Sequence, residues 1–414
     1  MRILIVNWSS RKIAGIEDYL TNVIPALHRN GDELAFVYEV DTPDTRERIP
    51  LPAGAPSWDV SVLGIRQTLW IMKAWSPDLI YAHGLLDPRF EAGFLKIAPA
   101  IYFTHNYYGT CISGMKTFKF PTVRPCSRKF GPACLLHYFP RRCGGRNPIT
   151  MWRLFRRESH RLANLHKYHA IVTHSRHMRE EYIRNGIPES RVHSFVYEIA
   201  KPHQEEPPGK KVGALANRQD TGKHRWNLLF VGRMELLKGG ATLLEALPTV
   251  AEQLGGPIQL TLAGEGPQRK AWEKKASKLQ ARHPGLEFQF AGWSDKNRLD
   301  QIYSQTDLLV VPSLWPEPFG RVGPEAGLRG IPVAAFNVGG ISDWLVNGVN
   351  GYLASGDPPT ADGLAGAIVQ CLQDLDVYRE LRKGARTVAA QFSLEHHLKA
   401  LYEVFDQVTA AVNA

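Results

Sequence analysis

The sequence of 414 residues predicts an α/β protein with two doubly wound, parallel-sheet domains that face each other across a cleft. Short apolar strands alternate with helical patterns, as expected of parallel sheets built from βαβ units. This alternation stops at a polar stretch rich in Pro and Gly, residues 201–226, and then starts again. The length also favours two domains, because a single core stops growing near about 250–300 residues.

Residues 1–200 are expected to form the N-terminal domain. Its predicted strands are Ile3–Asn7, Glu33–Tyr38, Trp58–Leu63, Leu79–Ala82, Ile101–Thr104 and Ala170–Thr173. Its predicted helices are Ile16–Arg29, Gln67–Ala74, Arg89–Lys96, Ile149–Lys167 and one capped by Ser175 that ends near Gly186. Residues 106–148 are irregular, rich in Gly, Pro, Cys and aromatic residues, and too long for an ordinary connection.

Residues 201–226 are the predicted linker, and residues 227–393 are expected to form the C-terminal domain. The predicted strands are Asn227–Val231, Ile258–Ala263, Leu286–Ala291, Asp307–Pro312 and Pro332–Phe336. The predicted helices are Gly239–Leu254, Pro267–Arg282, Ala326–Gly330, Ala361–Leu375, Val377–Gln391 and Leu394–Ala411. The last of these lies in residues 394–414. This C-terminal segment either stays with the second domain or crosses back to pack on the first.

Two glutamates, Glu317 and Glu325, flank the turn PFGRVGP at a strand-to-helix junction. Open parallel sheets bind their ligands at this edge. Gly320 allows close approach of the backbone, and the N–H groups that open the helix carry partial positive charge that suits a phosphate. The carboxylates are placed to accept hydrogen bonds from sugar or ribose hydroxyls. The alternative is that Glu325 only complements the helix dipole and Glu317 is solvated.

A second turn, LLFVGRMELLKGG, places Arg233 and Lys238 between a buried strand and the next helix. Two cations at this edge can hold a diphosphate and offset the charge that develops when it leaves. LAGEGP, which contains Gly264, and FAGW each close a strand with glycine at the same edge. The turn lacks the Gly-Lys-Ser/Thr run of a Walker loop and is not a Rossmann fingerprint. The alternative is a pair of solvated side chains.

These motifs resemble a known family. VGRMELLKGG, LAGEGP, FAGW and EPFGRVGPEAGLRGIPVAAFNVGGISDWLVNGVNGYL, in this order, are similar to the C-terminal domain of retaining GT-B glycosyltransferases of family 4, the glycosyl transferases group 1 type. MRILIV…AGIE, DLIYAHG, YFTHN and IVTHSRHMREEYIRNGIP resemble its N-terminal, acceptor-side domain, although AGIE replaces the family's double glycine. The resemblance covers nearly the whole chain.

The resemblance implies a retaining, metal-independent hexosyltransferase that needs no cofactor. It would move a sugar from a nucleotide-diphosphate sugar (UDP- or GDP-sugar) to a hydroxyl of a saccharide, a lipid-linked or a small-molecule acceptor. The implied catalytic residues are His105 and Glu317, and His83 is a weaker candidate of the same kind as His105. The implied donor-binding residues are Gly15, Arg233, Lys238, Gly264, Pro318, Phe319, Gly320, Arg321, Val322 and Glu325. A phosphorylase, a nucleotide-sugar epimerase and a non-catalytic sugar-nucleotide-binding module are the alternatives.

Charge and cysteine content raise two further expectations. Residues 1–200 hold 27 Lys and Arg against 17 Asp and Glu, so they carry the whole net charge of +10. This bias suggests an anionic acceptor, or peripheral contact of the basic helix Ile149–Lys167 with a membrane. The alternative for this helix is an ordinary helix of the N-terminal domain with a solvated basic face. The sequence lacks aromatic-plus-basic RNA motifs, which argues against nucleic acid. It also lacks a signal peptide and a transmembrane run, so we expect a cytoplasmic protein, at most peripheral on the inner membrane face.

Four of the five cysteines lie in the irregular segment: Cys111, Cys126, Cys134 and Cys143. They are candidate ligands of a structural zinc, with His137 as an alternative ligand, although unligated thiols are the competing interpretation. No catalytic metal is expected. The Asp-x-Asp sequence at Asp374–Asp376 lies between two late helices and is predicted to be surface.

Overall fold

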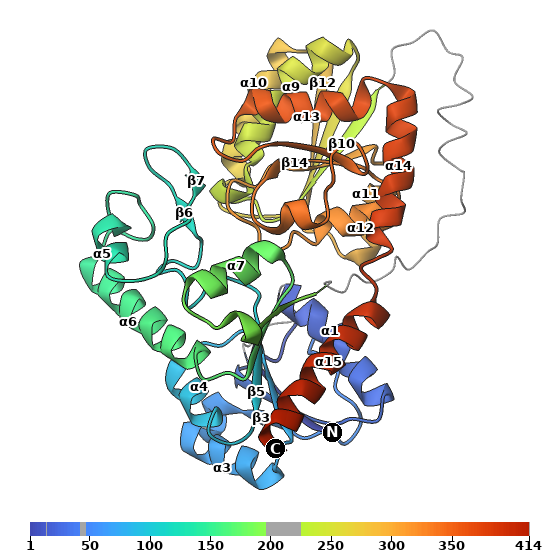
Figure 1. Cartoon of the computed structure of the whole chain (residues 1–414). Coiled ribbons are helices and arrows are strands. Elements are labelled where there is room, and N and C mark those ends of the chain that lie inside the picture. The colour runs from blue at the N-terminus through green and yellow to red at the C-terminus, as the bar shows by residue number, and fades with distance from the viewer. Residues whose placement is uncertain (14, 42–46, 196–224, 414) are drawn as a thin grey trace. The chain divides into compact units, whose positions relative to one another are not determined.

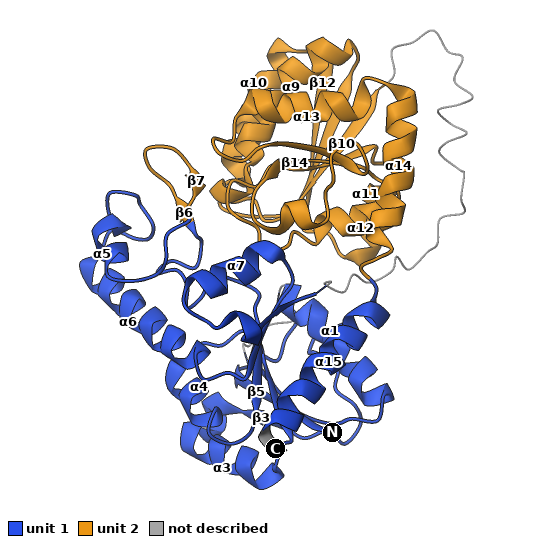
Figure 2. Ribbon diagram, in the orientation of Figure 1, with its two compact units in different colours: residues 1–116, 127–198, 393–414 blue, residues 117–126, 199–392 orange. Residues whose placement is uncertain are grey.

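The computed structural model describes residues 1–13, 15–41, 47–195 and 225–413. They divide into two compact units, coloured separately in Figure 2. The first is drawn from residues 1–116, 127–198 and 393–414, and the second from 117–126 and 199–392, in each case as far as these are described. Most of the predicted linker, residues 201–226, lies outside the described residues.

The first unit is built on a seven-stranded sheet in which every neighbouring pair is parallel. Its strands are β1 (Arg2–Ser9), β2 (Glu33–Val40), β3 (Ser57–Asp59), β4 (Leu79–Ala82), β5 (Ala100–Phe103), β8 (Ala170–Thr173) and β9 (Val192–Ser194). They lie in the order β3-β2-β1-β4-β5-β8-β9, so the winding reverses between β1 and β4. Every residue of β4, β5 and β8 is buried, as expected of strands covered on both faces.

Helices lie on both faces of this sheet (Figure 1). They are α1 (Gly15–Arg29), α2 (Val60–Leu63), α3 (Ile65–Trp75), α4 (Pro88–Phe94), α5 (Ala133–Tyr138), α6 (Pro148–Leu165), α7 (Arg176–Arg184) and α15 (Leu394–Asn413), with a 3-10 turn at Glu189–Arg191. Side-chain caps fix where several begin. Asn147 accepts from the N–H of Ile149 ahead of α6, and Ser175 accepts from the N–H of Met178, which confirms its predicted role as an N-cap.

The predicted strand Trp58–Leu63 is wrong beyond its first residues. The chain leaves the sheet after Asp59 and forms the short helix α2. The Asp59 carboxylate accepts hydrogen bonds from both the N–H and the hydroxyl of Ser61, and so caps the helix. A local side-chain bond of this kind outweighs the strand preference of the valines that follow.

The second unit repeats the winding of the first in a six-stranded parallel sheet. Its strands are β10 (Trp226–Val231), β11 (Ile258–Ala263), β12 (Leu286–Gly292), β13 (Leu308–Val311), β14 (Val333–Asn337) and β15 (Gly351–Ser355). The order β12-β11-β10-β13-β14-β15 places the reversal between β10 and β13. Ligands of doubly wound sheets bind outside the carboxyl ends of the strands at such a reversal.

The helices of the second unit also cover both faces of its sheet (Figure 1). They are α9 (Gly240–Leu254), α10 (Arg269–Arg282), α11 (Lys296–Ser304), α12 (Val322–Leu328), α13 (Ala361–Leu372) and α14 (Leu375–Ala389), with 3-10 turns η2 (Leu236–Lys238) and η3 (Gly340–Asp343). The helix predicted at Ala326–Gly330 begins four residues earlier than expected, because the chain already turns at Gly320 and the Arg321 carbonyl accepts from the N–H of Glu325.

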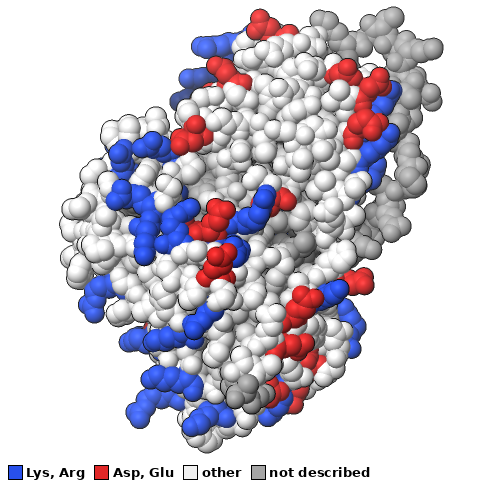
Figure 3. All heavy atoms as spheres, viewed as in Figure 1, with Lys and Arg blue, Asp and Glu red and all other residues white. Residues whose placement is uncertain are grey.

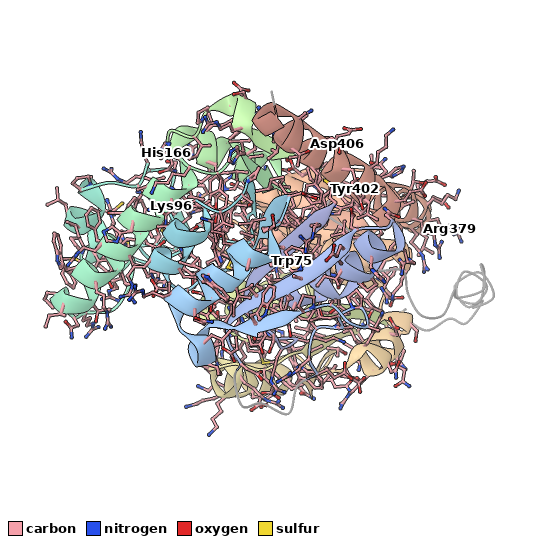
Figure 4. The ribbon with its side chains drawn as sticks, turned by 90° about the horizontal axis from the view of Figure 1, so that it is seen from below. Trp75, Lys96, His166, Arg379, Tyr402 and Asp406 are labelled. Carbon is pink, nitrogen blue, oxygen red and sulfur yellow. The ribbon has the colours of Figure 1, made fainter. Side chains whose placement is uncertain are left out.

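The C-terminal helix α15 packs into the first unit. Tyr402, which lies one turn before Asp406 on this helix (Figure 4), donates its hydroxyl proton to Asp32. The opposite oxygen of Asp32 accepts from the N-terminal ammonium of Met1 at 2.9 Å. Nearer the start of the helix, His397 is fully buried and shares a hydrogen bond of 2.7 Å with the hydroxyl of Tyr19.

The irregular segment between β5 and α6 holds little regular structure. It contains the two-residue strands β6 (Thr117–Phe118) and β7 (Arg124–Pro125), which pair antiparallel, and the short helix α5. Within the described part of the chain, no helix is long and apolar enough to cross a membrane.

Candidate active site

The carboxyl ends of β10 and β13 bring Lys238 and Glu317 together. The Lys238 ammonium donates to Oε1 of Glu317 at 2.7 Å, and the hydroxyl of Ser313 donates to the same oxygen. The Glu317 side chain is 7% exposed and that of Lys238 is 25% exposed. The Lys238 ammonium and the Glu317 carboxylate are thus in contact at the ligand-binding edge of the sheet, and the ammonium remains accessible to solvent.

Close backbone contacts hold this pair in place. Gly239, directly after Lys238, has φ +71°, and a Cβ there would lie 1.7 Å from the carbonyl oxygen of Pro312. Gly339 has φ +61°, and a Cβ there would lie 2.2 Å from the Glu317 carbonyl oxygen. The same carbonyl accepts from the N–H of Gly340 at 2.7 Å. Glycine is therefore required where these loops cross.

The turn that follows Glu317 lies on a buried tryptophan. The Trp344 indole N–H donates to the carbonyl of Phe319 at 2.6 Å. A Cβ at Gly323 would lie 2.0 Å from the Trp344 ring, and Gly320 has φ +88°. Trp344 thus sets the course of the backbone from Pro318 to Val322, the stretch predicted to bind the donor.

Glu325 lies in the first turn of α12 and faces Arg321. Arg321 Nε and Glu325 Oε1 are 3.6 Å apart, and both side chains are partly exposed. The Glu325 carbonyl accepts from the Arg329 guanidinium at 2.7 Å. The Glu325 carboxylate thus faces Arg321 in the turn that follows Glu317, and its contact with a ribose stays a prediction.

Arg233 differs from its predicted partner Lys238. Its side chain is 71% exposed and its guanidinium pairs with Glu235 at 3.1 Å. Gly264, at the end of the neighbouring strand β11, has φ +138°, and a Cβ there would lie 2.0 Å from the carbonyl oxygen of Gly232. The two strand ends are therefore packed backbone against backbone, with Arg233 extending from them into solvent.

In the first unit, His83 and His105 follow the adjacent strands β4 and β5. Nδ1 of His83 lies 3.2 Å from Nε2 of His105, and the ring of His174, after β8, lies 5.8 Å from that of His105. His105 is partly exposed, whereas His83 is fully buried. Burial, and then the neighbouring His397, lower the pKa of His83 to about 3. Only His105 of the two can meet a ligand directly.

Gly15 is the exposed first residue of α1, and two residues later Glu17 is fully buried. The Glu17 carboxylate accepts from the indole N–H of Trp8 at 2.9 Å and from the amide of Asn7 at 3.3 Å. Sequence reasoning missed Glu17, because an acid in the first turn of a helix is usually solvated. The motif AGIE was the available signal.

Three other residues around the Lys238–Glu317 pair were also missed. Ser313 is buried and bonded to Glu317, Trp344 supports the donor turn, and the ring of Trp315 lies 5.4 Å from the Lys238 ammonium. Trp344 lies in the motif that runs from Glu317 to Leu353, and Ser313 and Trp315 lie just before it. Their side-chain contacts carry no signature of their own.

The zinc prediction receives no support from side-chain positions. Across the described residues, no group of three or more His, Cys, Asp or Glu side chains is placed to hold a metal ion. The cysteines Cys111, Cys126, Cys134 and Cys143 are not joined in disulfides, and burial raises the pKa of Cys134. Asp374 and Asp376 are exposed, as predicted, and Asp374 caps α14. Elemental analysis of the purified protein remains the test for zinc.

Comparisons with known proteins match both halves of the chain. The model of the family Glycosyl transferases group 1 matches residues 215–388, and that of Glycosyltransferase Family 4 matches residues 13–195. The chain belongs to the family 4 glycosyltransferases of the GT-B type. The motifs at Lys238, Glu317 and Glu325 lie within the first of these matches, and His83 and His105 lie within the second.

Relatives of this glycosyltransferase include an uncharacterized glycosyltransferase of Methanocaldococcus jannaschii, which is 31% identical over 180 residues, 43% of this chain and 44% of the relative. Glycogen synthase of Mycobacterium tuberculosis is 34% identical over 171 residues, 41% of this chain and 39% of the relative. The matches therefore span less than half the length of these curated relatives.

Solved structures show the fold of this glycosyltransferase over its whole length. The HepE protein of Anabaena in complex with UDP has a TM-score of 0.66 at 18% identity, with 99% of this chain and 100% of that chain covered. Its complex with UDP-glucose has a TM-score of 0.64 at the same identity and coverage. The fold predicted from the sequence, two Rossmann-like units with parallel sheets, is confirmed.

Proposed function

We propose that this glycosyltransferase moves a hexose from a nucleotide-diphosphate sugar to an acceptor hydroxyl, with retention of configuration and without a metal ion. The observation that carries the proposal is the Lys238–Glu317 pair at the carboxyl ends of β10 and β13, 2.7 Å apart and open to solvent on the Lys238 side. The complexes of HepE with UDP and UDP-glucose support a UDP-sugar as donor, with a GDP-sugar as the alternative.

The donor's diphosphate would meet Lys238 and the backbone N–H groups between Phe319 and Val322. When the bond between the sugar and the diphosphate breaks, negative charge builds up on the phosphate oxygens. A fixed cation and oriented N–H dipoles stabilise this charge more than they stabilise the bound donor, so they lower the barrier. Arg233, which is exposed, would close onto the diphosphate from solvent, and Gly264 ends the neighbouring strand beside it. In the first unit we assign Gly15 to the donor as well.

Glu317 and Glu325 would hold the two sugars of the donor. Glu317 would accept hydrogen bonds from hydroxyls of the transferred hexose, and Glu325 from those of the ribose. Ser313 keeps one oxygen of Glu317 fixed, so the carboxylate presents a defined edge. In the first unit we assign His105 to the transferred sugar, because its ring is partly exposed at the carboxyl end of β5.

The transfer itself needs no covalent enzyme intermediate in this proposal. The acceptor oxygen forms a bond to the anomeric carbon on the face from which the phosphate leaves, and the bond from that carbon to the phosphate oxygen breaks. The acceptor's hydroxyl proton passes to the departing phosphate oxygen. The products are a nucleoside diphosphate and a glycoside with the donor's anomeric configuration.

Release of nucleoside diphosphate from a panel of UDP- and GDP-sugars, in the presence of saccharide and lipid-linked acceptors, tests the proposal. The expected result is acceptor-dependent release that persists in EDTA, with an unchanged anomeric configuration by NMR. An inverted product, or loss of activity in EDTA, would overturn the retaining or the metal-free part. Phosphate as co-substrate would mark a phosphorylase, an epimerised donor an epimerase, and binding without turnover a non-catalytic module.

For the acceptor side, we assign peripheral contact with an anionic membrane to the basic surface formed by α5 and α6. Four large apolar side chains on these two helices or directly after α5 are exposed: Leu136 (76%), Phe139 (40%), Ile149 (77%) and Trp152 (52%). The face opposite packs on the buried cluster Ile112, Phe130 and Tyr138. The helices are therefore anchored to the first unit while an apolar edge faces solvent.

The charge around this edge is of one sign. Exposed cations lie on the two helices or next to them in the sequence, namely Arg128, Lys129, Arg142, Arg146, Arg153 and Arg156. Figure 3 shows Lys and Arg gathered on the left, where Figure 1 places α5 and α6. The one acid between residues 127 and 167 is Glu158, which is buried and accepts from the N–H of Gly109. Apolar side chains together with cations suit an anionic lipid surface, where a lipid-linked acceptor would be found.

Sedimentation with vesicles tests this contact. We expect binding to vesicles with anionic lipid and little binding to neutral ones, because the cations supply part of the attraction. Replacing Ile149 and Trp152 with Ser should weaken binding by about 10–100-fold, since two large apolar side chains are lost. The matched control is Trp70→Ser, which removes a tryptophan that is 66% exposed on α3 and should change nothing. Equal binding to neutral and anionic vesicles, or none, would refute the assignment.

A further inference from the structure

His83 has a position that its sequence motif does not explain. It follows β4 at the ligand-binding edge of the first unit, yet none of its surface is exposed. The Tyr81 ring packs edge-on against it at 4.3 Å, and the rings of Tyr19 and Phe103 lie at 5.6 and 5.9 Å. A side chain enclosed in this way does not touch the donor or the acceptor, so any effect on the reaction passes through a neighbour.

That neighbour is His105. The 3.2 Å separation between Nδ1 of His83 and Nε2 of His105 fits one hydrogen bond with a single shared proton. The other titratable groups that face the two rings are Tyr19 from α1, Tyr81 from β4, His174 after β8 and His397 from α15. Tyr19 is bonded to both Tyr81 and His397, at 2.7 Å each. The aromatic groups behind the histidines are thus already bonded to one another.

The direction of the hydrogen bond follows from the burial of His83. Because burial keeps its imidazole neutral, His83 carries one N–H. Its Nε2 has no hydrogen-bond partner among the described residues. A proton on Nε2 would bury an unpaired donor, whereas a proton on Nδ1 is used in the bond to His105. Orphaned buried donors are rarer than orphaned acceptors among backbone groups, and the same preference places the proton on Nδ1 here.

We infer that His83 is a positioning residue: it donates from Nδ1 to Nε2 of His105 and so holds the His105 ring in one orientation, as the neutral tautomer with its proton on Nδ1. The hydrogen bond made by one ring nitrogen decides which nitrogen of an imidazole is protonated. His105 would then present an N–H rather than a lone pair on Nδ1. The consequence for turnover rests on the proposed function, in which His105 meets the transferred sugar.

The first test reads the tautomer directly and needs no activity. Nitrogen-15 NMR of histidine-labelled wild-type protein, with the His105 signals assigned by their absence in His105→Gln, should show a protonated Nδ1 and an unprotonated Nε2. A His105 with its proton on Nε2 overturns the inference. If the wild type shows no transferase activity, the proposed function fails, but this measurement still decides the role of His83.

The second test compares two variants. In His83→Asn the amide N–H can take the place of Nδ1–H, so the tautomer should persist and kcat should stay within about 10-fold of wild type. In His83→Leu the donor is lost, and kcat should fall about 100-fold with the donor KM changed less than about 3-fold, because the reacting group is misplaced rather than removed. His28→Gln, at an exposed histidine of α1, is the matched control and should leave both values unchanged.

Three outcomes would contradict the inference. Wild-type kcat in a folded His83→Leu protein would show that the bond is not used. An unchanged tautomer in that variant would show that His83 does not set it. If His83→Leu does not fold, His83→Asn decides the question. Loss of the His105 tautomer in folded His83→Asn protein would contradict the inference, because the Asn amide N–H would then have failed to replace Nδ1–H of His83.

Discussion

Removing the charge from Lys238 or Glu317 should affect stability and turnover differently. The change is Lys238→Met, which keeps the aliphatic stem, together with Glu317→Gln and the double variant. In Lys238→Met the Glu317 carboxylate, which is 7% exposed, loses its cation. Of the two hydrogen-bond donors to Oε1 described above, Ser313 alone remains. Glu317→Gln leaves a cation that is 25% exposed and can turn toward water. We therefore expect Lys238→Met to be the more destabilising single change.

The magnitude follows from the geometry of the pair. Two unit charges 2.7 Å apart attract by about 6 kcal/mol at an effective dielectric constant of about 20. Lost hydration offsets most of this, and measured effects run from about 0.2–1 kcal/mol for exposed pairs to about 3–5 kcal/mol when a buried pair is broken. Lys238 and Glu317 are intermediate in burial. We expect Lys238→Met to lower the free energy of unfolding by about 2 kcal/mol and Glu317→Gln to lower it by about 1 kcal/mol. The coupling energy between the two changes, from the double variant, should be about 2 kcal/mol.

Urea unfolding of the four proteins measures the coupling, and nucleoside diphosphate release measures turnover. Both single variants should lose about 100- to 1,000-fold in kcat, because each removes a group that acts on developing charge. The double variant should regain stability but not activity. Lys383 and Glu380 form an exposed pair at the same 2.7 Å and provide the matched control, with an expected coupling below about 0.5 kcal/mol. Activity within 10-fold of wild type in Lys238→Met would refute the assigned role.

Three other changes have outcomes that the structure defines. Gly239→Ala should cost more than about 3 kcal/mol in urea unfolding, because its Cβ would lie 1.7 Å from the Pro312 carbonyl oxygen; a cost below 1 kcal/mol would contradict this. Trp344→Phe leaves the Phe319 carbonyl without its indole donor, so it should cost about 1–3 kcal/mol and raise the donor KM; an unchanged KM would show that the donor turn does not need this support. Burial raises the pKa of Glu39 from 4.5 to about 7, which favours the protonated folded state. The stabilising contribution of Glu39 to the free energy of unfolding is therefore present below pH 4.5 and falls by about 3 kcal/mol as the pH rises to 7. Urea unfolding of wild type and Glu39→Gln at several pH values should show this fall in the wild type alone. Parallel plots of the free energy of unfolding against pH for the two proteins would refute the prediction.

The sequence predicted the placement of Lys238 and Glu317 well, although 79 residues separate them. The reason is geometric: parallel strands end at one edge of their sheet, so the residues after each buried strand gather there. Glycine positions carried the same information, because backbone crossings such as that at Gly239 tolerate no side chain. The pairing of Arg233 with Glu235, by contrast, depends on rotamers of two exposed side chains, which no pattern specifies.

The contacts that the sequence did not reveal are made by residues with no periodic or motif signal. Trp344 reaches Phe319 across 25 residues, and His397 reaches Tyr19 across 378. The strand expected at Trp58–Leu63 failed because one carboxylate, that of Asp59, caps a helix instead. The partners of Trp344 and His397 can be identified only once the fold is known, whereas Asp59 bonds to Ser61 two residues away and competes locally with the strand.

The packing of α15 into the first unit has a consequence for how the protein is made. The sheet of that unit is complete once residue 194 has been synthesised, but His397 and Tyr402 follow about 200 residues later. At about 5–20 residues per second, the ribosome needs about 10–40 s to reach them. During that time Tyr19 and Asp32 lack their partners on α15. The unit that begins the chain is therefore finished last, and a ribosome that stalls anywhere in the second unit leaves the tyrosine and histidine cluster behind His105 open to water.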